Sequence, residues 1–154
     1  EYVIVQATVT NGSQSVVTIR PENFVLRLAG GRDVRAGAAS AVVSDFLARA
    51  GRNDVIRLVS TYEVGLYGLS RFRSTNGYEQ RRQSALAEVT STRLRAAAAA
   101  SAIVFVEVKL APGDSTDGAL FFPTRGVPLL GSRLRVAAAG QSFEFLPESV
   151  EPAR

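Results

Sequence analysis

Residues 103–123 read IVFVEVKLAPGDSTDGALFFP, and this stretch decides the fold. Apolar side chains at the even-numbered positions from Val104 to Leu110 alternate with the charged Glu107 and Lys109. Such alternation is typical of a half-buried antiparallel strand, because successive side chains point to opposite faces. Pro112-Gly113-Asp114 then supplies a turn, and a second apolar strand follows. The stretch therefore predicts a β-hairpin.

Further strands are expected on both sides of the middle of the chain. The first strand-rich segment runs from Tyr2 to about Gly37, with turns at Asn11-Gly12-Ser13 and at Gly30-Gly31. The second runs from Ile103 to Leu146. There we expect a turn at Gly140-Gln141 and an inward face made of Leu134, Val136, Ala138, Phe143 and Phe145. Residues 147–154 are polar and contain prolines, so we expect a fraying tail.

The middle segment, about Ala38 to Ala102, has helical rather than alternating periodicity. Apolar residues recur at helical spacing from Val42 to Leu47, and Gly51 stands where that helix would end. Val55 to Leu69 also fits the helical period, although its β-branched residues leave a strand as an alternative at its start. Tyr78 to Ala100 is rich in helix formers.

These segments predict one domain, residues 1–146, that is mostly β with a helical insertion at about 38–102 (α+β). The strands before and after the insertion must share a core, since either group alone would leave a wide apolar face exposed. We therefore expect an antiparallel β-sandwich. With 154 residues, of which 46% are hydrophobic and 21% charged, the chain is long and apolar enough to bury that core.

The composition argues against catalysis. The chain contains no His and no Cys, which removes the usual general base, the usual nucleophile pairs and the soft metal ligands. Asp114-Ser115-Thr116-Asp117-Gly118 has the composition of a calcium loop but lacks the distal Glu of an EF-hand, so a tight turn explains it better. We expect no catalytic residue, no cofactor and no metal site.

Two pieces of the chain carry a resemblance to a known family. Tyr2 to Asn11 is similar to an opening strand that ends in Asn at a turn, and a Phe24-x-Leu26 strand follows it. Leu110 to Pro123 resembles a hairpin with the order leucine, proline-glycine, glycine, leucine-phenylalanine. Both are found in immunoglobulin-like β-sandwich domains of bacterial secreted proteins and lipoproteins. The resemblance implies an extracytoplasmic, envelope-associated and non-catalytic domain, and it transfers no catalytic residue.

The helical insertion is the predicted contact surface, because insertions at the end of a rigid sandwich are where binding surfaces usually form. Aromatic and basic side chains interleave there, and the candidate partner-binding residues are Tyr62, Tyr67, Arg71, Phe72, Arg73, Tyr78, Arg81 and Arg82. The leading hypothesis is a binding or assembly domain whose partner is another protein or an envelope component. The alternative is binding of nucleic acid or another anionic polymer by the same residues.

The charge distribution and the start of the chain bear on its partners and its origin. The net charge is +4, but the arginines are spread along the chain, which disfavours nucleic acid as the partner. No apolar run approaches the ~20 residues of a membrane span. Because the chain begins at Glu1 and contains no Met, we expect it to be either a processed form or an excised piece of a longer protein.

Overall fold

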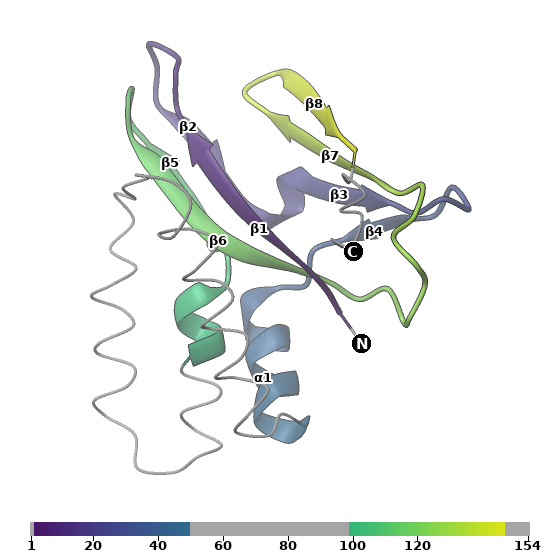
Figure 1. Cartoon of the computed structure of the whole chain (residues 1–154). Helices are drawn as coiled ribbons and strands as arrows, with labels where there is room; N and C mark the ends of the chain where they lie inside the picture. The colour runs from purple at the N-terminus through teal and green to yellow at the C-terminus, as the bar shows by residue number, and fades with distance from the viewer. Residues whose placement is uncertain (1, 50–98, 147–154) are drawn as a thin grey trace, which may run out of the picture.

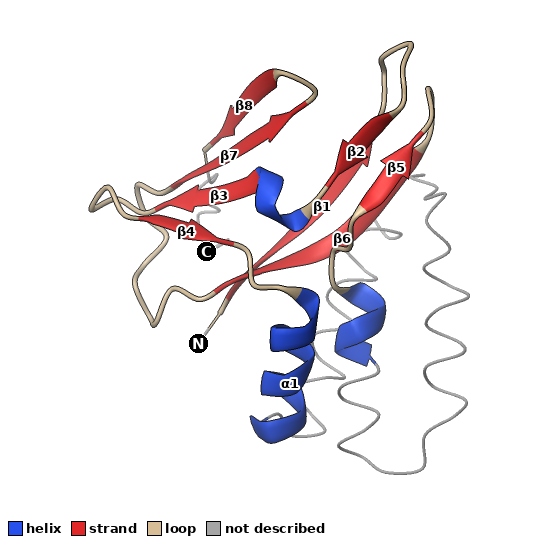
Figure 2. Ribbon diagram, turned by 180° about the vertical axis from the view of Figure 1, so that it is seen from behind, coloured by secondary structure: helices blue, strands red, loops and turns tan. Residues whose placement is uncertain are grey.

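The structure is a computed structural model, and it describes residues 2–49 and 99–146. The described part of the chain consists mostly of strands in antiparallel sheets (Figures 1 and 2). In chain order the elements are β1 Val3–Thr10, β2 Val17–Ile19, the 3-10 turn η1 Pro21–Asn23, β3 Phe24–Arg27, β4 Asp33–Arg35, α1 Ala39–Arg49, β5 Val108–Leu110, β6 Ser115–Phe122, β7 Arg133–Ala138 and β8 Gln141–Phe145. Residues 99–103 are helical as well. The predicted mostly β class is confirmed.

The described part of the chain contains two antiparallel ladders of two strands each. β1 pairs antiparallel with β6, from Val3 opposite Phe122 to Thr10 opposite Ser115. β2 pairs antiparallel with β5, from Val17 opposite Leu110 to Ile19 opposite Val108. The β1–β2 and β5–β6 turns therefore lie side by side, as both views show at the top of the molecule (Figures 1 and 2).

Asn11 joins these two turns. Its backbone N–H donates to the Asp114 carbonyl at 2.9 Å, and its own carbonyl accepts from the Gly113 N–H at 2.8 Å. Its buried side-chain amide donates to the carbonyls of Ser15 and Leu110. Every polar group of this buried residue is thus satisfied, which is what allows an Asn to stand in the interior. The predicted turn at Asn11 is confirmed.

The larger sheet has the strand order β4-β3-β7-β8. Its β3–β4 hairpin closes at Gly31, whose φ of 82° requires a glycine-like conformation, so the predicted turn at Gly30-Gly31 is confirmed. At the β7–β8 turn the structure corrects the prediction. The turn residues are Ala139 and Gly140, with φ of 50° and 76°, and Gln141 already pairs with Ala138 as the first residue of β8. Alternation identified the face of each side chain but left the turn position one residue uncertain.

The main core joins the four-stranded sheet to the two ladders. Phe105 lies at its centre, with its ring centroid 5.1 Å from that of Phe24 in an edge-to-face arrangement. The same buried cluster contains side chains from six strands, and Leu28 just after β3: Ile19, Leu26, Leu28, Val34, Leu110, Leu120, Phe122 and Val136.

A second apolar cluster packs α1 and residues 99–103 against β6, and these helical segments lie next to each other in both views (Figures 1 and 2). Val42 of α1 is fully buried, and the ring of Phe46 meets that of Phe121 edge to face at 5.7 Å. The Tyr2 hydroxyl donates to Asp45 Oδ2 at 2.7 Å and ties β1 to the helix. Burial, and then this hydrogen bond, raise the pKa of Tyr2. The predicted helix from Val42 to Leu47 is confirmed, and it belongs to the folded core.

The hairpin predicted for residues 103–123 is wrong in its pairing. Residues 99–103 are helical, the strand begins only at Val108, and β5 pairs with β2 whereas β6 pairs with β1. Between helix and strand, Val104 forms an isolated parallel bridge to Ala119, and the Phe105 N–H donates to the Ala119 carbonyl at 2.9 Å. Glu107 and Lys109 do face solvent, as expected.

The predicted helices at 55–69 and 78–100 and the predicted tail at 147–154 fall wholly or almost wholly outside the described residues, so they stay predictions. Among residues 2–49 and 99–146, no helix is long and apolar enough to cross a membrane.

Candidate functional site

All eight predicted partner-binding residues, from Tyr62 to Arg82, lie outside the described residues. Their proposed contact with a protein or an anionic polymer therefore stays a prediction. If these residues bind a nucleic acid, the affinity should fall steeply with added salt, because arginines that contact the phosphates release counterions from the polymer. The described part of the chain offers a different candidate, the four-stranded sheet.

The strand register assigns the side chains of this sheet to two faces. On one face Leu26 lies between Val34 and Leu134, and Phe145 follows on β8. This inner face contributes to the main core. The opposite, outer face carries charged residues on all four strands: Arg27, Asp33, Arg35, Arg133, Arg135 and Glu144.

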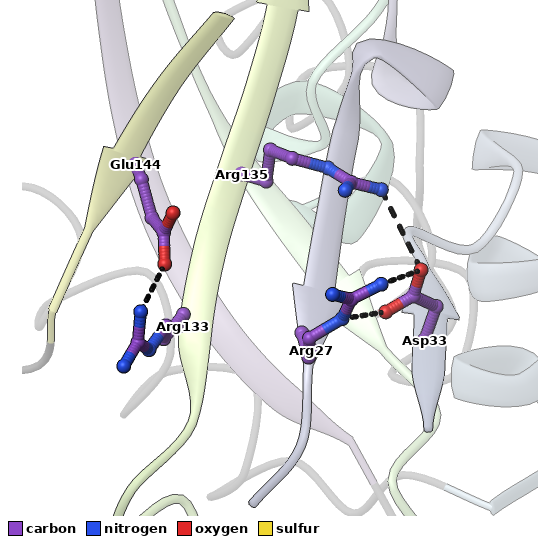
Figure 3. A network of polar contacts seen from close by, with 5 residues as sticks. All are labelled: Arg27, Asp33, Arg133, Arg135 and Glu144. Atoms are coloured by element: carbon purple, nitrogen blue, oxygen red, sulfur yellow. Dashed lines mark hydrogen bonds and ion pairs between the residues drawn. The ribbon is translucent and has the colours of Figure 1, made fainter. Parts of the chain in front are cut away.

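The outer face is a network of ion pairs (Figure 3). Asp33 accepts two hydrogen bonds from Arg27, at 2.7 and 3.1 Å, and lies 3.5 Å from Arg135. Glu144 of β8 accepts from Arg133 at 2.9 Å. The hydrogen bond from Arg27 lowers the pKa of Asp33, and the same bond raises that of Arg27. The two acids hold three of the four arginines in exposed ion pairs, and the face keeps an excess of two positive charges.

The side chains of the inner face are not all buried to the same extent. Val136 of β7 is 8% exposed, but its cross-strand neighbour Phe143 is 48% exposed and Phe145 is 55% exposed. Leu146 follows just beyond the end of β8 and is 68% exposed. We call Phe143, Phe145 and Leu146 the β8 strip. Large apolar side chains gathered at one place on a surface mark contact sites more often than single exposed residues do.

Among the described strands, β8 is also the less protected edge of the four-stranded sheet. The opposite edge, β4, has three residues, and the charged Asp33 and Arg35 flank its one buried side chain. β8 has five residues with the sequence Gln-Ser-Phe-Glu-Phe, all of them exposed, and contains neither Pro nor Lys. Edge strands with such unpaired backbone groups pair readily with another strand. β8 therefore combines an apolar strip with a backbone edge able to accept a partner.

The run from Asp114 to Gly118 is divided between a turn and a strand. Asp114 Oδ2 accepts the Ala111 N–H at 3.1 Å, which is the local turn bonding that the sequence suggests. Asp117 belongs to β6 and is buried. Among the described residues, no group of three or more acidic side chains is arranged to hold a metal ion.

Sequence reasoning placed Phe143 and Phe145 on the inner face but missed their exposure. A strand pattern shows which face is apolar, whereas burial depends on what packs against that face. The available signal was weak: β8 is the last predicted strand, and a terminal strand is often an edge.

Comparison of the chain with protein-family models, with curated proteins and with solved structures finds no match. The candidate site therefore rests on the geometry of the four-stranded sheet alone.

Proposed function

We propose that the chain is a non-catalytic binding or assembly domain, and that it contacts another protein through the β8 strip. The observation that carries this proposal is the half-exposure of Phe143 and Phe145 on the sheet face whose apolar side chains on the other three strands are buried or half-buried. A sequence without His or Cys supports the non-catalytic part.

The exposed aromatic surface gives the proposal an energetic basis. A Phe side chain that is half exposed presents ~100 Å² of apolar surface, and covering it is worth ~2–3 kcal/mol at ~25 cal/mol per Å². Two such side chains, at 48% and 55% exposure, thus provide an anchor for a partner. Anchors of this kind dominate the binding energy of protein interfaces.

The finer description of the fold and the cellular location belong to the same proposal. Antiparallel ladders around a shared core and the resemblance of Tyr2 to Asn11 and of Leu110 to Pro123 support an immunoglobulin-like sandwich in an extracytoplasmic protein. Cell fractionation of the native protein tests the location. Recovery in the cytosolic fraction would contradict the envelope association.

Site-specific photo-crosslinking in cells of the source organism tests the contact surface. We expect a photoreactive phenylalanine analogue at position 143 to give discrete crosslinked protein species. The matched control is the same analogue at Val16, which is 63% exposed and apolar but lies outside the β8 strip. Absence of any crosslink from position 143, or equal crosslinks from both positions, would remove the proposal.

A further inference from the structure

We infer that the protein to which the β8 strip binds is a second copy of this chain, joined through antiparallel pairing of β8 with β8. The inference rests on the proposed function and adds the identity of the partner. Its premises are the edge position of β8, the orientation of its backbone groups and the charges along it.

The β7–β8 turn determines which backbone groups face outward. Ala139 and Gly140 both have positive φ and connect Ala138 to its partner Gln141, as in a two-residue type I′ hairpin. The residues that flank such a turn form a hydrogen-bonded pair, and such pairs then alternate with non-bonded pairs along the ladder. Ser142 and Glu144 therefore direct their N–H and C=O groups away from β7, toward the free edge.

Only some registers of β8 against β8 use these outward groups. A two-fold axis at Phe143 places Ser142 of each copy opposite Glu144 of the other, so both outward-facing residues form hydrogen-bonded pairs. Centring the axis on Glu144 would instead oppose two carboxylates, which is unfavourable across a strand pair. Centring it on Ser142 would leave Glu144 beyond the strand, opposite the Gly140 turn. Charge and backbone orientation together select the register centred on Phe143.

This register also matches the apolar residues. Phe143 meets Phe143 of the second copy in a non-hydrogen-bonded pair, in which facing side chains approach most closely. Phe145 lies opposite Gln141 and diagonal to Phe143 of the second copy, so the aromatic side chains of both copies share one face. The outer face stays compatible, because Glu144 remains next to Arg133 and meets an uncharged Ser142. β8 is thus complementary to itself.

The expected dimer is weak. A five-residue strand pair buries less than the ~1,200 Å² of a standard interface. Sedimentation velocity of the purified chain over a concentration series up to ~1 mM, the range of weak complexes, should show a reversible monomer–dimer equilibrium.

Substitutions at Ser142 test the pairing and its register. Ser142→Pro removes an outward N–H that β7 does not use, so it should give a folded monomer, whereas Ser142→Ala keeps that N–H and should keep the dimer. Ser142→Arg faces Glu144 of the second copy and should tighten the dimer roughly 2- to 30-fold, since each dimer holds two such pairs. Ser142→Glu should weaken it by a similar factor. Circular dichroism and thermal unfolding verify that each variant folds.

A chain that stays monomeric at every concentration, with Ser142→Arg as with the native residue, would overturn the inference. So would a dimer that is indifferent to Ser142→Pro, or one that responds equally to Arg and Glu at position 142. The proposed function fails by a different result, the absence of crosslinks from position 143 in cells. Crosslinks to a different protein, together with a monomeric purified chain, would keep the proposed function and reject the second copy.

Discussion

Gly118 of β6 lies against the backbone of Phe105, so that a Cβ atom added to Gly118 would stand 2.5 Å from Phe105 Cα. The hydrogen bond from the Phe105 N–H to the Ala119 carbonyl, 2.9 Å long, holds the two segments together. This contact seats the Phe105 ring against Phe24 in the main core. Glycine is required at this position by space and not by backbone conformation.

Gly118→Ala should therefore destabilise the chain strongly. The nearest clash is with backbone, which cannot rotate away as a side chain would, so we expect a loss of about 3 kcal/mol in the free energy of unfolding, the upper end of the usual cost of overpacking. Urea denaturation followed by circular dichroism measures it. Gly12→Ala is the matched control, because a Cβ there meets nothing within 4 Å. Equal effects of the two substitutions would contradict the close contact.

Asn11 provides a second test of how the two ladders are joined. Its Nδ2 donates to the Leu110 carbonyl at 2.9 Å and to the Ser15 carbonyl at 2.8 Å. Asn11→Ala should cost about 2–3 kcal/mol, since it removes both hydrogen bonds, of which the one to the Leu110 carbonyl is buried. Asn11→Asp should be destabilising at neutral pH as well, because a carboxylate cannot donate. A loss no larger than that of the exposed Gln14→Ala would show that Asn11 does not join the turns.

The sequence pattern predicts faces well and partners poorly. It placed Val136 inside and Glu107 outside, as the structure does, because alternation follows directly from strand geometry. It paired 103–110 with 115–123 because they are adjacent in sequence. The structure instead pairs β5 with β2. The close approach of Phe105 to Gly118 accompanies this pairing, and the local pattern holds no record of a contact between residues on different segments.

The candidate site was predictable only in part. Alternation placed Phe143 and Phe145 on the inner face, and the register confirms that they share it with Val136 and Leu134. Their exposure depends on how far the elements packed against the inner face extend toward β8, which is a property of the tertiary structure. The predicted contact residues from Tyr62 to Arg82 lie outside the described part of the chain, and their role stays a prediction.

Ala139 offers a stabilising substitution in the β7–β8 turn. Its φ of 50° is unfavourable for alanine, whereas asparagine tolerates this conformation and Asn-Gly is the preferred type I′ pair. Ala139→Asn should raise the free energy of unfolding by about 0.5–1 kcal/mol. Thermal and urea unfolding at low protein concentration separate this effect from association. Ala137→Asn, inside β7, is the control and should be neutral or destabilising; a gain there as large as at position 139 would contradict the turn assignment.

The pair formed by Asp33 and Arg27 predicts a specific pH dependence. The two hydrogen bonds from Arg27, at 2.7 and 3.1 Å, lower the pKa of Asp33 in the folded chain. Because the folded pKa lies below the unfolded value of about 3.9, the pair stabilises the fold above about pH 4. That contribution is lost as the pH falls through the folded pKa. Both side chains are solvent-exposed, so the effect is modest and decreases with salt.

A double-mutant cycle with Arg27→Gln and Asp33→Asn isolates this pair from the other charges of the outer face. We expect a favourable coupling free energy at pH 7 and low salt. It should shrink when the pH is lowered toward 2, where the carboxylate becomes protonated, and when the salt concentration is raised at pH 7. Asp33 also lies 3.5 Å from Arg135. That contact is present both in the native chain and in Arg27→Gln, so it cancels from the coupling free energy. A coupling that persists unchanged at pH 2, or grows there, would show that the pair does not respond to pH in this way.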